Sequence, residues 1–112
     1  MPKHIYINYS LRDQTIAHAI CQYLEEAGFR CWIAPRDIRA GHEWAKAILN
    51  GIEESAAFVL VLSPESNQSI FLRREIALAV DRNIPIIPVM VAPVELTGSL
   101  AFQLGSLQSL AL

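Results

Sequence analysis

The sequence has few of the features that nucleic-acid-binding or membrane proteins need. Its 112 residues carry a formal net charge of -2, so it lacks the basic excess typical of proteins that bind nucleic acid. The longest apolar runs, 56–62 and 84–91, are far shorter than the roughly 20 residues of a membrane span. No charged segment followed by an apolar one opens the chain, so no secretory signal is visible. We therefore expect a protein that binds neither nucleic acid nor a membrane.

Cysteine is scarce as well. Cys21 and Cys31 are the only two, and they form no CxxC motif. No histidine or cysteine accompanies them at a metal-binding spacing, so we expect no metal site. Cys31 is interpreted as a small hydrophobic residue on a strand. Two isolated thiols fit a reducing compartment, which predicts a cytoplasmic protein.

What the chain does contain is enough apolar material for one packed domain. Hydrophobic residues make up 53% of the sequence and charged residues 18%, which is typical of a folded globule. At this length a single core closes comfortably, so residues 1–112 are expected to form one domain.

Apolar strands alternate with amphipathic helices along the chain. Strands are expected at 5–9, 29–33, 56–62 and 84–91, with a short fifth at 107–112. Helices are expected from the capping-box-like Ser10–Asp13 to Gly28, over 44–52, and from Ser69 to Asn83. Trp44 shares its helical spacing with Ile48 and Ile52 and is predicted to be in the core.

This alternation predicts a doubly wound α/β fold. The sheet should be parallel, with helices on both faces and right-handed crossovers. For a domain this small we expect the flavodoxin-like strand order 2-1-3-4-5. Strands one and three then flank a crevice, where the loops 9–13 and 63–69 meet with loop 34–43 alongside.

Three common activities of this fold do not fit the crevice. A phospho-receiver domain needs acidic residues after strands one and three and a late lysine, whereas Asn8, Tyr9 and Ser63 occupy those strand ends and no lysine follows Lys46. A flavodoxin needs a glycine-containing phosphate loop after strand one, and none is present. The dinucleotide motif GxGxxG is absent too.

Glu75 is the acidic residue that the crevice does offer. It lies in the third helix with Phe71 one turn earlier on the same face. With Tyr9, Ser10 and Arg12 opposite, these side chains could hold a ribose, stack a base and stabilise an oxocarbenium ion. An ion pair from Glu75 to Arg12 or to a neighbouring helix residue explains the same residues more simply, and the residues alone favour it.

The loop 34–41 combines Arg36, Asp37 and Arg39 with a proline and a glycine. The two arginines could receive a phosphate or a partner's carboxylate. A solvated loop in which Asp37 pairs locally is an equally good interpretation. For Ser63 and Ser69 helix capping is favoured over nucleophilic catalysis, because no base is placed beside them.

The order and spacing of these segments resemble a TIR domain of the bacterial type, over about residues 4–105. The matching segments are 5–10 with Asp13, 24–32, 34–38 with Gly41, and 63–69 leading to Glu75. The resemblance implies a flavodoxin-like fold. It also implies the activity of many members, which cleave the nicotinamide–ribose bond of NAD+ and in some cases form cyclic products.

By this resemblance Glu75 is the catalytic residue and NAD+ the substrate, with no cofactor and no metal. The substrate-binding residues would be Tyr9, Ser10, Arg12, Phe71, Ser69 and Arg36. Phe71 stands where the family often has tryptophan, and Asn8 where serine is usual. Bacterial members serve mainly in anti-phage defence, so defence or signalling is the expected role.

The resemblance further implies activation by self-assembly, in which the BB loop of one copy docks on a neighbour. The expected interface residues are Pro35, Asp37, Ile38, Arg39 and Gly41. A scaffold that signals by homotypic TIR assembly without chemistry remains the alternative. Family members usually carry another helix after strand five, which leaves open that the chain lacks this helix or is a fragment of a larger protein.

Overall fold

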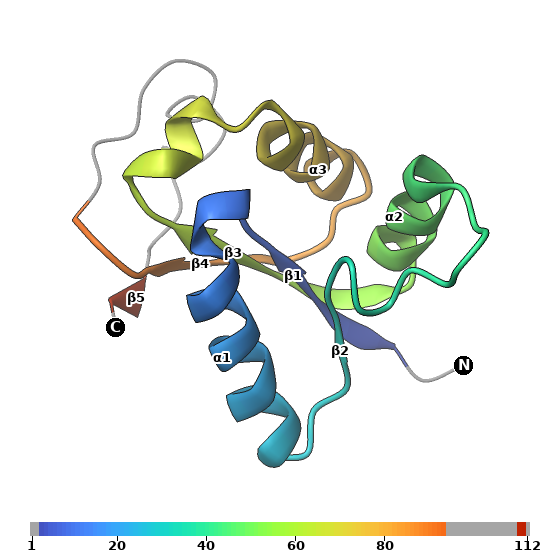
Figure 1. Ribbon diagram of the computed structural model, residues 1–112, viewed down its shortest axis with the longest axis horizontal. Coiled ribbons are helices and arrows are strands. Elements are labelled where there is room, and N and C mark those ends of the chain that lie inside the picture. The colour runs from blue at the N-terminus through green and yellow to red at the C-terminus, as the bar shows by residue number, and fades with distance from the viewer. Residues whose placement is uncertain (1–2, 94–109, 112) are drawn as a thin grey trace.

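The computed structural model describes residues 3–93 and 110–111 (Figure 1). Five parallel strands form one sheet in the order β2-β1-β3-β4-β5. This confirms the predicted flavodoxin-like order. The strands are β1 (His4–Asn8), β2 (Cys31–Trp32), β3 (Ser55–Leu62), β4 (Ile86–Met90) and β5 (Leu110–Ala111). Of the fifth strand expected at 107–112, residues 107–109 and 112 lie outside the described residues.

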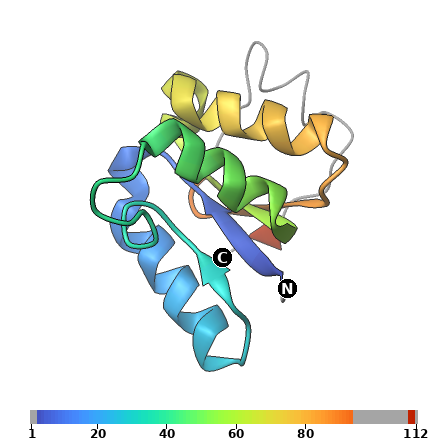
Figure 2. The same ribbon diagram turned by 90° about the vertical axis from the view of Figure 1, so that its right-hand side faces the viewer.

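Helices cover both faces of the sheet, as the sequence predicts. Helix α1 packs on one face, and α2 and α3 pack on the other (Figures 1 and 2). The helices are α1 (Gln14–Glu26), α2 (Trp44–Glu53) and α3 (Ile70–Asp81), with short 3-10 turns at Leu11–Asp13 and Pro64–Gln68. No helix in the described part of the chain has both the length and the apolar character of a membrane span.

The alternation of side chains along the strands divides the core into two halves. From β3, Phe58 and Leu60 face α2 and α3, whereas Val59 and Val61 face α1. On β1, Tyr6 joins the first half and Ile7 the second. Since side chains alternate along a strand, successive residues of β1 pack on opposite faces of the sheet, one toward α2 and α3 and the next toward α1.

Turn and cap residues define the ends of the helices. Gly28 follows α1 with φ of +99°, as predicted for a helix C-cap. Ser63 and Ser69 accept hydrogen bonds from the backbone N–H groups of Glu65 and Leu72, which confirms their capping role. The capping box expected at Ser10–Asp13 does not form: Ser10 Oγ instead donates to Asp13 Oδ2 at 3.0 Å.

The prediction that Trp44 is in the core is wrong, because Trp44 is 56% exposed. In a β-α-β unit the helix runs opposite to the strands, so its first turn lies at their carboxyl-end edge. Trp44 is the first residue of α2 and therefore lies at this edge, while Ile48 and Ile52 pack on the core. Phe29 was placed on a strand, but β2 begins only at Cys31 and Phe29 is exposed.

Pro88 lies inside β4, where the sequence led us to expect prolines only at a strand end or at an edge. Val91 N–H donates to the Leu62 carbonyl of β3. Because N–H groups alternate in direction along a strand, the nitrogen of Pro88 faces away from β3. Pro88 has no N–H group to donate, but at this position it therefore removes no hydrogen bond between β4 and β3.

An aromatic stack joins the sheet to α2. The Tyr6 ring lies between Trp32 and Phe58, with centroid distances of 5.0 Å and 5.2 Å. Gly51 of α2 covers the far side of Trp32. A Cβ at Gly51 would lie 2.9 Å from Trp32 Cε2, which is too close for an undisturbed ring.

We predict that Gly51→Ala destabilises the fold. Overpacking of a core costs about 1–3 kcal/mol, which exceeds the gain of up to about 1 kcal/mol from replacing glycine in a helix. Urea unfolding measures the balance, with Asn50→Ala on the exposed side of the same helix as the control. A Gly51→Ala variant as stable as this control would show that Trp32 moves aside freely.

Candidate functional site

The candidate site is built around the Glu75 carboxylate. Tyr6 Oη donates to Glu75 Oε1 at 2.8 Å, and Asn8 Nδ2 donates to the same oxygen at 2.9 Å. Tyr6 and Asn8 are two residues apart on β1, so both side chains lie on the face that α3 covers. Helix α3 buries Leu72, Ile76 and Ala79 against that face, which brings Glu75 over the end of β1.

The two carboxylate oxygens of Glu75 have different surroundings. Among the described residues, no hydrogen bond is made to Oε2, and Oε2 is not one of the buried atoms without a partner. One oxygen is thus fixed by two donors, and the other is not hydrogen-bonded by any described residue. Beside it, Asn8 Oδ1 is buried and has no hydrogen-bond partner in the part of the chain that the structure describes. An unpaired buried acceptor is costly, and a hydroxyl donor entering beside Glu75 would satisfy it.

Burial raises the pKa of Glu75, and the hydrogen bonds from Asn8 and Tyr6 partly oppose this effect. Burial and the nearby Glu75 charge also raise the pKa of Tyr6. Tyr6 therefore stays protonated and acts as a donor to the carboxylate. A partly buried carboxylate with a perturbed pKa at the carboxyl edge of a parallel sheet is typical of a functional site.

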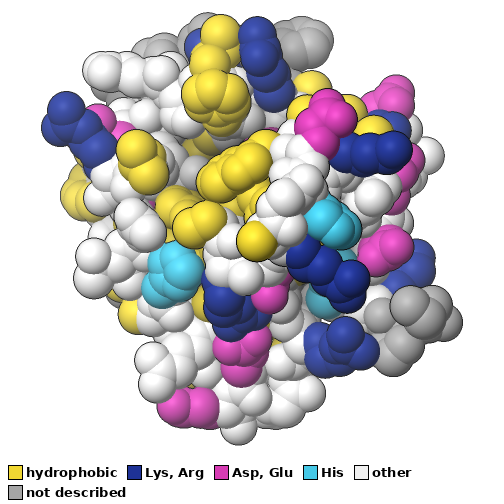
Figure 3. Space-filling view, turned by 45° about the vertical axis from the view of Figure 1, so that its right-hand side comes forward, with side chains coloured by type: hydrophobic (Ala, Val, Ile, Leu, Met, Phe, Trp, Pro, Cys, Tyr) yellow, Lys and Arg dark blue, Asp and Glu magenta, His cyan; other side chains and the backbone are white. Residues whose placement is uncertain are grey.

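Two exposed aromatic residues lie at the same edge of the sheet. Phe71 is 71% exposed, one helical turn before Glu75, and Trp44 begins α2. Figure 3 shows hydrophobic side chains gathered over the middle and top of this face, bordered by charged residues and histidine. A planar ring would find apolar surface next to the carboxylate.

Arg12 does not pair with Glu75, so the ion pair considered between these two residues is wrong. Its guanidinium lies 3.7 Å from Glu65 and is mostly exposed. The loop that carries Arg12 is fixed by Asp13, which accepts hydrogen bonds from Ser10 and Ser63. Arg12 is thus an exposed cation with one long ion pair.

Tyr9 and Ser10, predicted with Glu75, lie at the same end of β1 and make protein contacts there. Tyr9 Oη donates to the Ala34 carbonyl and so connects β1 to the loop 34–43. Ser10 is buried and bonded to Asp13, and Ser69 caps α3. The Tyr9 ring packs on the α1 side of the sheet, opposite to Tyr6 and Asn8. The substrate contacts of Tyr9, Ser10 and Ser69 stay predictions.

The structure places Arg36 away from Glu75. Its guanidinium donates to Glu25 Oε1 at 2.9 Å, to Asp37 Oδ2 at 2.8 Å and to the Cys31 carbonyl at 3.0 Å. Asp37 also accepts the Ile33 N–H at 2.8 Å. The local pairing that we considered for Asp37 is thus present, and these contacts hold the base of the loop.

The remaining loop residues lie along the same segment. Pro35, Ile38, Arg39 and Gly41 follow β2, and Gly41 has φ of +82°, which disfavours any other residue there. Their assignment to an interface stays a prediction.

Sequence reasoning missed Tyr6 and Asn8, which contact Glu75 directly. From the sequence, Tyr6 is placed only in a strand, and Asn8 is considered only at a strand end and as a departure from the serine usual in the family. The signal that could have found them is their spacing: two polar groups at i and i+2 on an otherwise apolar strand share one face. A group able to hold a metal, Cys21, Glu25 and Cys31, lies on the α1 side of the sheet, away from Glu75.

The raised pKa of Glu75 predicts that Glu75→Gln stabilises the fold. Because the folded carboxyl holds its proton more tightly than the unfolded one, the free energy of unfolding falls as pH rises from about 4.3 to the raised pKa. A glutamine can still accept from Tyr6 and does not ionise. We expect Glu75→Gln to unfold at a higher temperature than the wild type at neutral pH. The difference should disappear below the ordinary glutamate pKa, as thermal scans at both pH values would test.

Comparison with known proteins gives one curated relative. The chain is 32% identical over 98 residues to a stimulator of interferon genes protein from Magallana gigas, covering 82% of this chain. The chain spans about 24% of the length of that relative. A structure of a metazoan TIR-STING receptor from C. gigas matches 79% of the chain and 30% of its own, at 31% identity and a TM-score of 0.68.

Two further structures share the fold at lower identity. The TIR domain of the Toll-related receptor TRR-2 from Hydra magnipapillata matches 98% of this chain and 84% of its own, with a TM-score of 0.84 and 22% identity. The TIR domains of the activated Roq1 resistosome match 80% and 58%, with a TM-score of 0.73 and 16% identity. The TIR-STING and Hydra relatives are metazoan, so they do not bear on the bacterial type. The TIR domain family model matches residues 5–112, and the chain belongs to the TIR domain family.

Proposed function

We propose that this TIR domain is an NAD+ glycohydrolase that cleaves the nicotinamide–ribose bond, with Glu75 as its catalytic residue. The observation that carries the proposal is the asymmetric environment of the Glu75 carboxylate. Oε1 is fixed by Tyr6 and Asn8, whereas no described residue makes a hydrogen bond to Oε2. A carboxylate held in one orientation and partly withdrawn from water is suited to stabilise a positive charge that develops next to it.

In the proposed reaction the ribose of NAD+ binds beside Glu75. Its hydroxyls donate to Oε2 and to the unpaired Asn8 Oδ1. The nicotinamide leaves with the electron pair of the broken bond, and the carboxylate stabilises the oxocarbenium ion that remains. Capture of this ion by water gives ADP-ribose, and capture by a nucleophile of the same molecule gives a cyclic product. The exposed Phe71 ring provides a surface on which a planar base can stack.

The side chains of the other predicted substrate-binding residues differ in how many protein contacts they must break before they can reach a substrate. Arg12 has a mostly exposed side chain and one long ion pair, so it can turn toward the diphosphate at little cost. Tyr9, Ser10 and Ser69 use their hydroxyls within the protein and would have to break these bonds to contact a substrate. Arg36 would have to leave Glu25 and Asp37 before it could reach a substrate.

We propose that self-assembly activates the enzyme. Trp44 and Phe71 are exposed at the edge of the sheet where Glu75 lies, so a second copy could cover this edge and exclude water. The loop 34–43, with Pro35, Asp37, Ile38, Arg39 and Gly41, is the proposed docking segment, and Tyr9 links this loop to β1 next to the site. A role in defence or signalling in the cytoplasm is part of the same proposal.

A non-catalytic scaffold is the second candidate function. The observation in its favour is that the chain covers about 24% of a curated relative named as a stimulator of interferon genes protein. That name describes signalling and not chemistry. A scaffold would use the same exposed face for assembly and would not need an ionised Glu75, so the two candidates differ in what Glu75 does.

Glu75→Gln is predicted to abolish release of nicotinamide from NAD+ while the chain still self-associates. The amide keeps the shape and the bond from Tyr6 but removes the negative charge, so activity should fall at least about 100-fold, a loss of roughly 2.7 kcal/mol or more of transition-state stabilisation. Chromatography of the products at high protein concentration measures the rate. Glu53→Gln, which disturbs only a surface pair with Arg82, serves as the control.

Wild type and both variants without activity, but with unchanged self-association by light scattering, would favour the scaffold. Equal activity of wild type and Glu75→Gln would remove Glu75 from the mechanism.

Tyr6→Phe is predicted to shift the pH dependence of the activity. The ionised Glu75 is the active form, so kcat/KM should rise with pH through its raised pKa. Tyr6 donates to the charged carboxylate and thereby lowers this pKa. Removing the donor raises the pKa further, and the acid limb of the profile should move to higher pH.

The matched control is Tyr23→Phe, which changes an exposed tyrosine on α1. A profile of Tyr6→Phe that is unmoved, or moved to lower pH, would contradict the proposed role of this hydrogen bond.

A further inference from the structure

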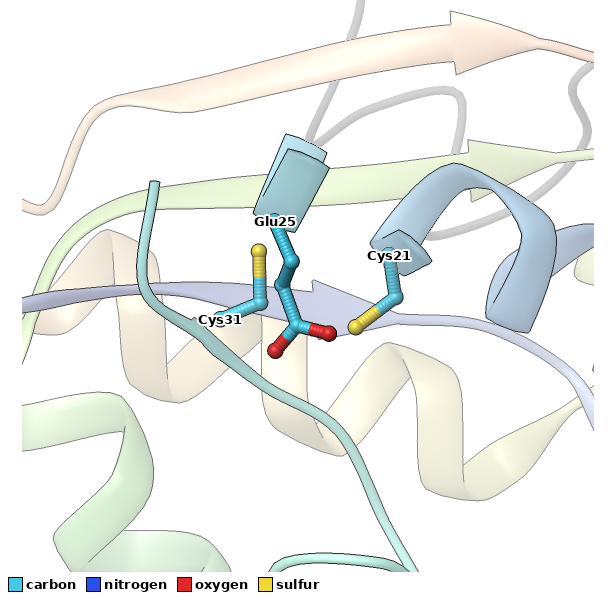
Figure 4. A group of neighbouring side chains, drawn as sticks. All are labelled: Cys21, Glu25 and Cys31. Carbon is cyan, nitrogen blue, oxygen red and sulfur yellow. The ribbon is translucent and has the colours of Figure 1, made fainter. Parts of the chain in front are cut away.

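Cys21, Glu25 and Cys31 come together on the face of the sheet that α1 covers. Cys21 and Glu25 lie one turn apart on α1, and Cys31 begins β2. One ligand atom from each residue lies within 4.8 Å of the other two. Figure 4 shows the three side chains converging in the space between α1 and β2. The proposed function uses none of them.

We propose that these three residues form a binding site for a thiophilic divalent cation of the zinc class. The ligands are the sulfur atoms of Cys21 and Cys31 and one carboxylate oxygen of Glu25. Two thiolates and a carboxylate are ligands that zinc accepts in proteins. The site is separate from Glu75, which lies on the other face of the sheet.

The separations suit a tetrahedral ion. With zinc–sulfur and zinc–oxygen bonds of about 2.3 Å and 2.1 Å, ligand atoms on one ion stand about 3.5–3.8 Å apart. The cluster is already within 4.8 Å, so side-chain rotation alone can close it. Cys21 is buried and Glu25 is exposed. The fourth coordination position therefore opens on the solvent side, where a water molecule or a ligand can occupy it.

Arg36 offsets part of the charge of the site. Two thiolates and the Glu25 carboxylate carry three negative charges, and a divalent cation leaves one. The Arg36 guanidinium lies 2.9 Å from Glu25 Oε1 and 3.0 Å from the Cys31 carbonyl, so it offsets part of the remainder, although it also pairs with Asp37 at 2.8 Å. It also orients the carboxylate, as the hydrogen-bonded neighbours of metal ligands do.

Binding must displace the thiol protons. Burial raises the pKa of Cys31 to about 12 and raises that of Cys21 as well, so both are thiols before the cation arrives. One cation replaces two protons, which leave to the solvent, and no oxidant or reductant is needed. Glu25, Arg36 and Asp37 are the charged groups that face the two sulfurs.

The location of the site gives it a structural consequence. The cation would fasten the end of α1 to β2, next to Arg36 and Asp37 at the base of the loop 34–43. A cation that binds only the folded chain stabilises it by mass action. The site would therefore fix the segment through which we propose that copies of the domain assemble.

Titration of the reduced 112-residue chain with Co²⁺, followed by displacement with Zn²⁺, tests the proposal. We expect one ion per chain and a thiolate-to-cobalt charge-transfer absorption that Zn²⁺ removes. Cys31→Ser should abolish this absorption, and Glu25→Gln should weaken binding at least about tenfold, as loss of a zinc-site partner does. Glu26→Gln, the adjacent carboxylate on the same helix, is the matched control and should bind like the wild type.

Thermal unfolding with and without Zn²⁺ distinguishes a variant that has lost the binding site from one that has failed to fold. Zn²⁺ should raise the unfolding temperature of the wild type and of Glu26→Gln, and leave that of folded Cys31→Ser unchanged. Absence of stoichiometric binding, or a charge-transfer band that survives in Cys31→Ser, would overturn the proposal. So would a chain whose two thiols form a disulfide in air, seen as a loss of two hydrogens by mass, while the reduced chain binds no cation.

Discussion

The hydrogen bond from Tyr6 to Glu75 is the interaction that connects the core of this protein to its candidate site. The Tyr6 ring lies between Trp32 and Phe58, and Gly51 allows α2 to approach the outer side of Trp32. A large, tightly packed ring has little freedom, so its hydroxyl is held in place. Glu75 is thus oriented by the packing of three strands and a helix and not by a flexible loop, as a preorganised electrostatic site requires.

Burial and hydrogen bonding shift the pKa of Glu75 in opposite directions, and the balance between them suits this residue to the proposed catalysis. Burial disfavours the carboxylate, while Tyr6 and Asn8 favour it. Without the donors the pKa of Glu75 would be raised further, and without the burial its charge would be screened by water. This arrangement destabilises the fold, since an ionised buried group and the unpaired Asn8 Oδ1 are both unfavourable.

The two faces of the sheet carry separate chemistry because side chains alternate along the strands. Tyr6 points to the α3 side, where it reaches Glu75, and Ile7 points to the α1 side. The cysteine and glutamate cluster lies on that second side, and Arg36 and Asp37 link it to the loop 34–43. Tyr9 links the same loop to the end of β1. The loop 34–43 therefore contacts residues next to the cysteine and glutamate cluster and a residue at the end of β1, the strand that carries the donors to Glu75.

The sequence by itself determined the strand order, the layering of the helices, and the caps at Ser63 and Ser69, because these follow from local periodicity and from the spacing of recognisable segments. Only the tertiary structure decided the partners: Tyr6 and Asn8 on Glu75, Glu65 on Arg12, Glu25 on Arg36, and Cys21 beside Cys31. The tertiary structure also decided the exposure of Trp44, since periodicity gives the apolar face of a helix but not where the helix extends beyond the sheet. The physical reason is that hydrogen bonds and ion pairs act over a few ångströms between residues far apart in the chain, and only the packed sheet sets those distances.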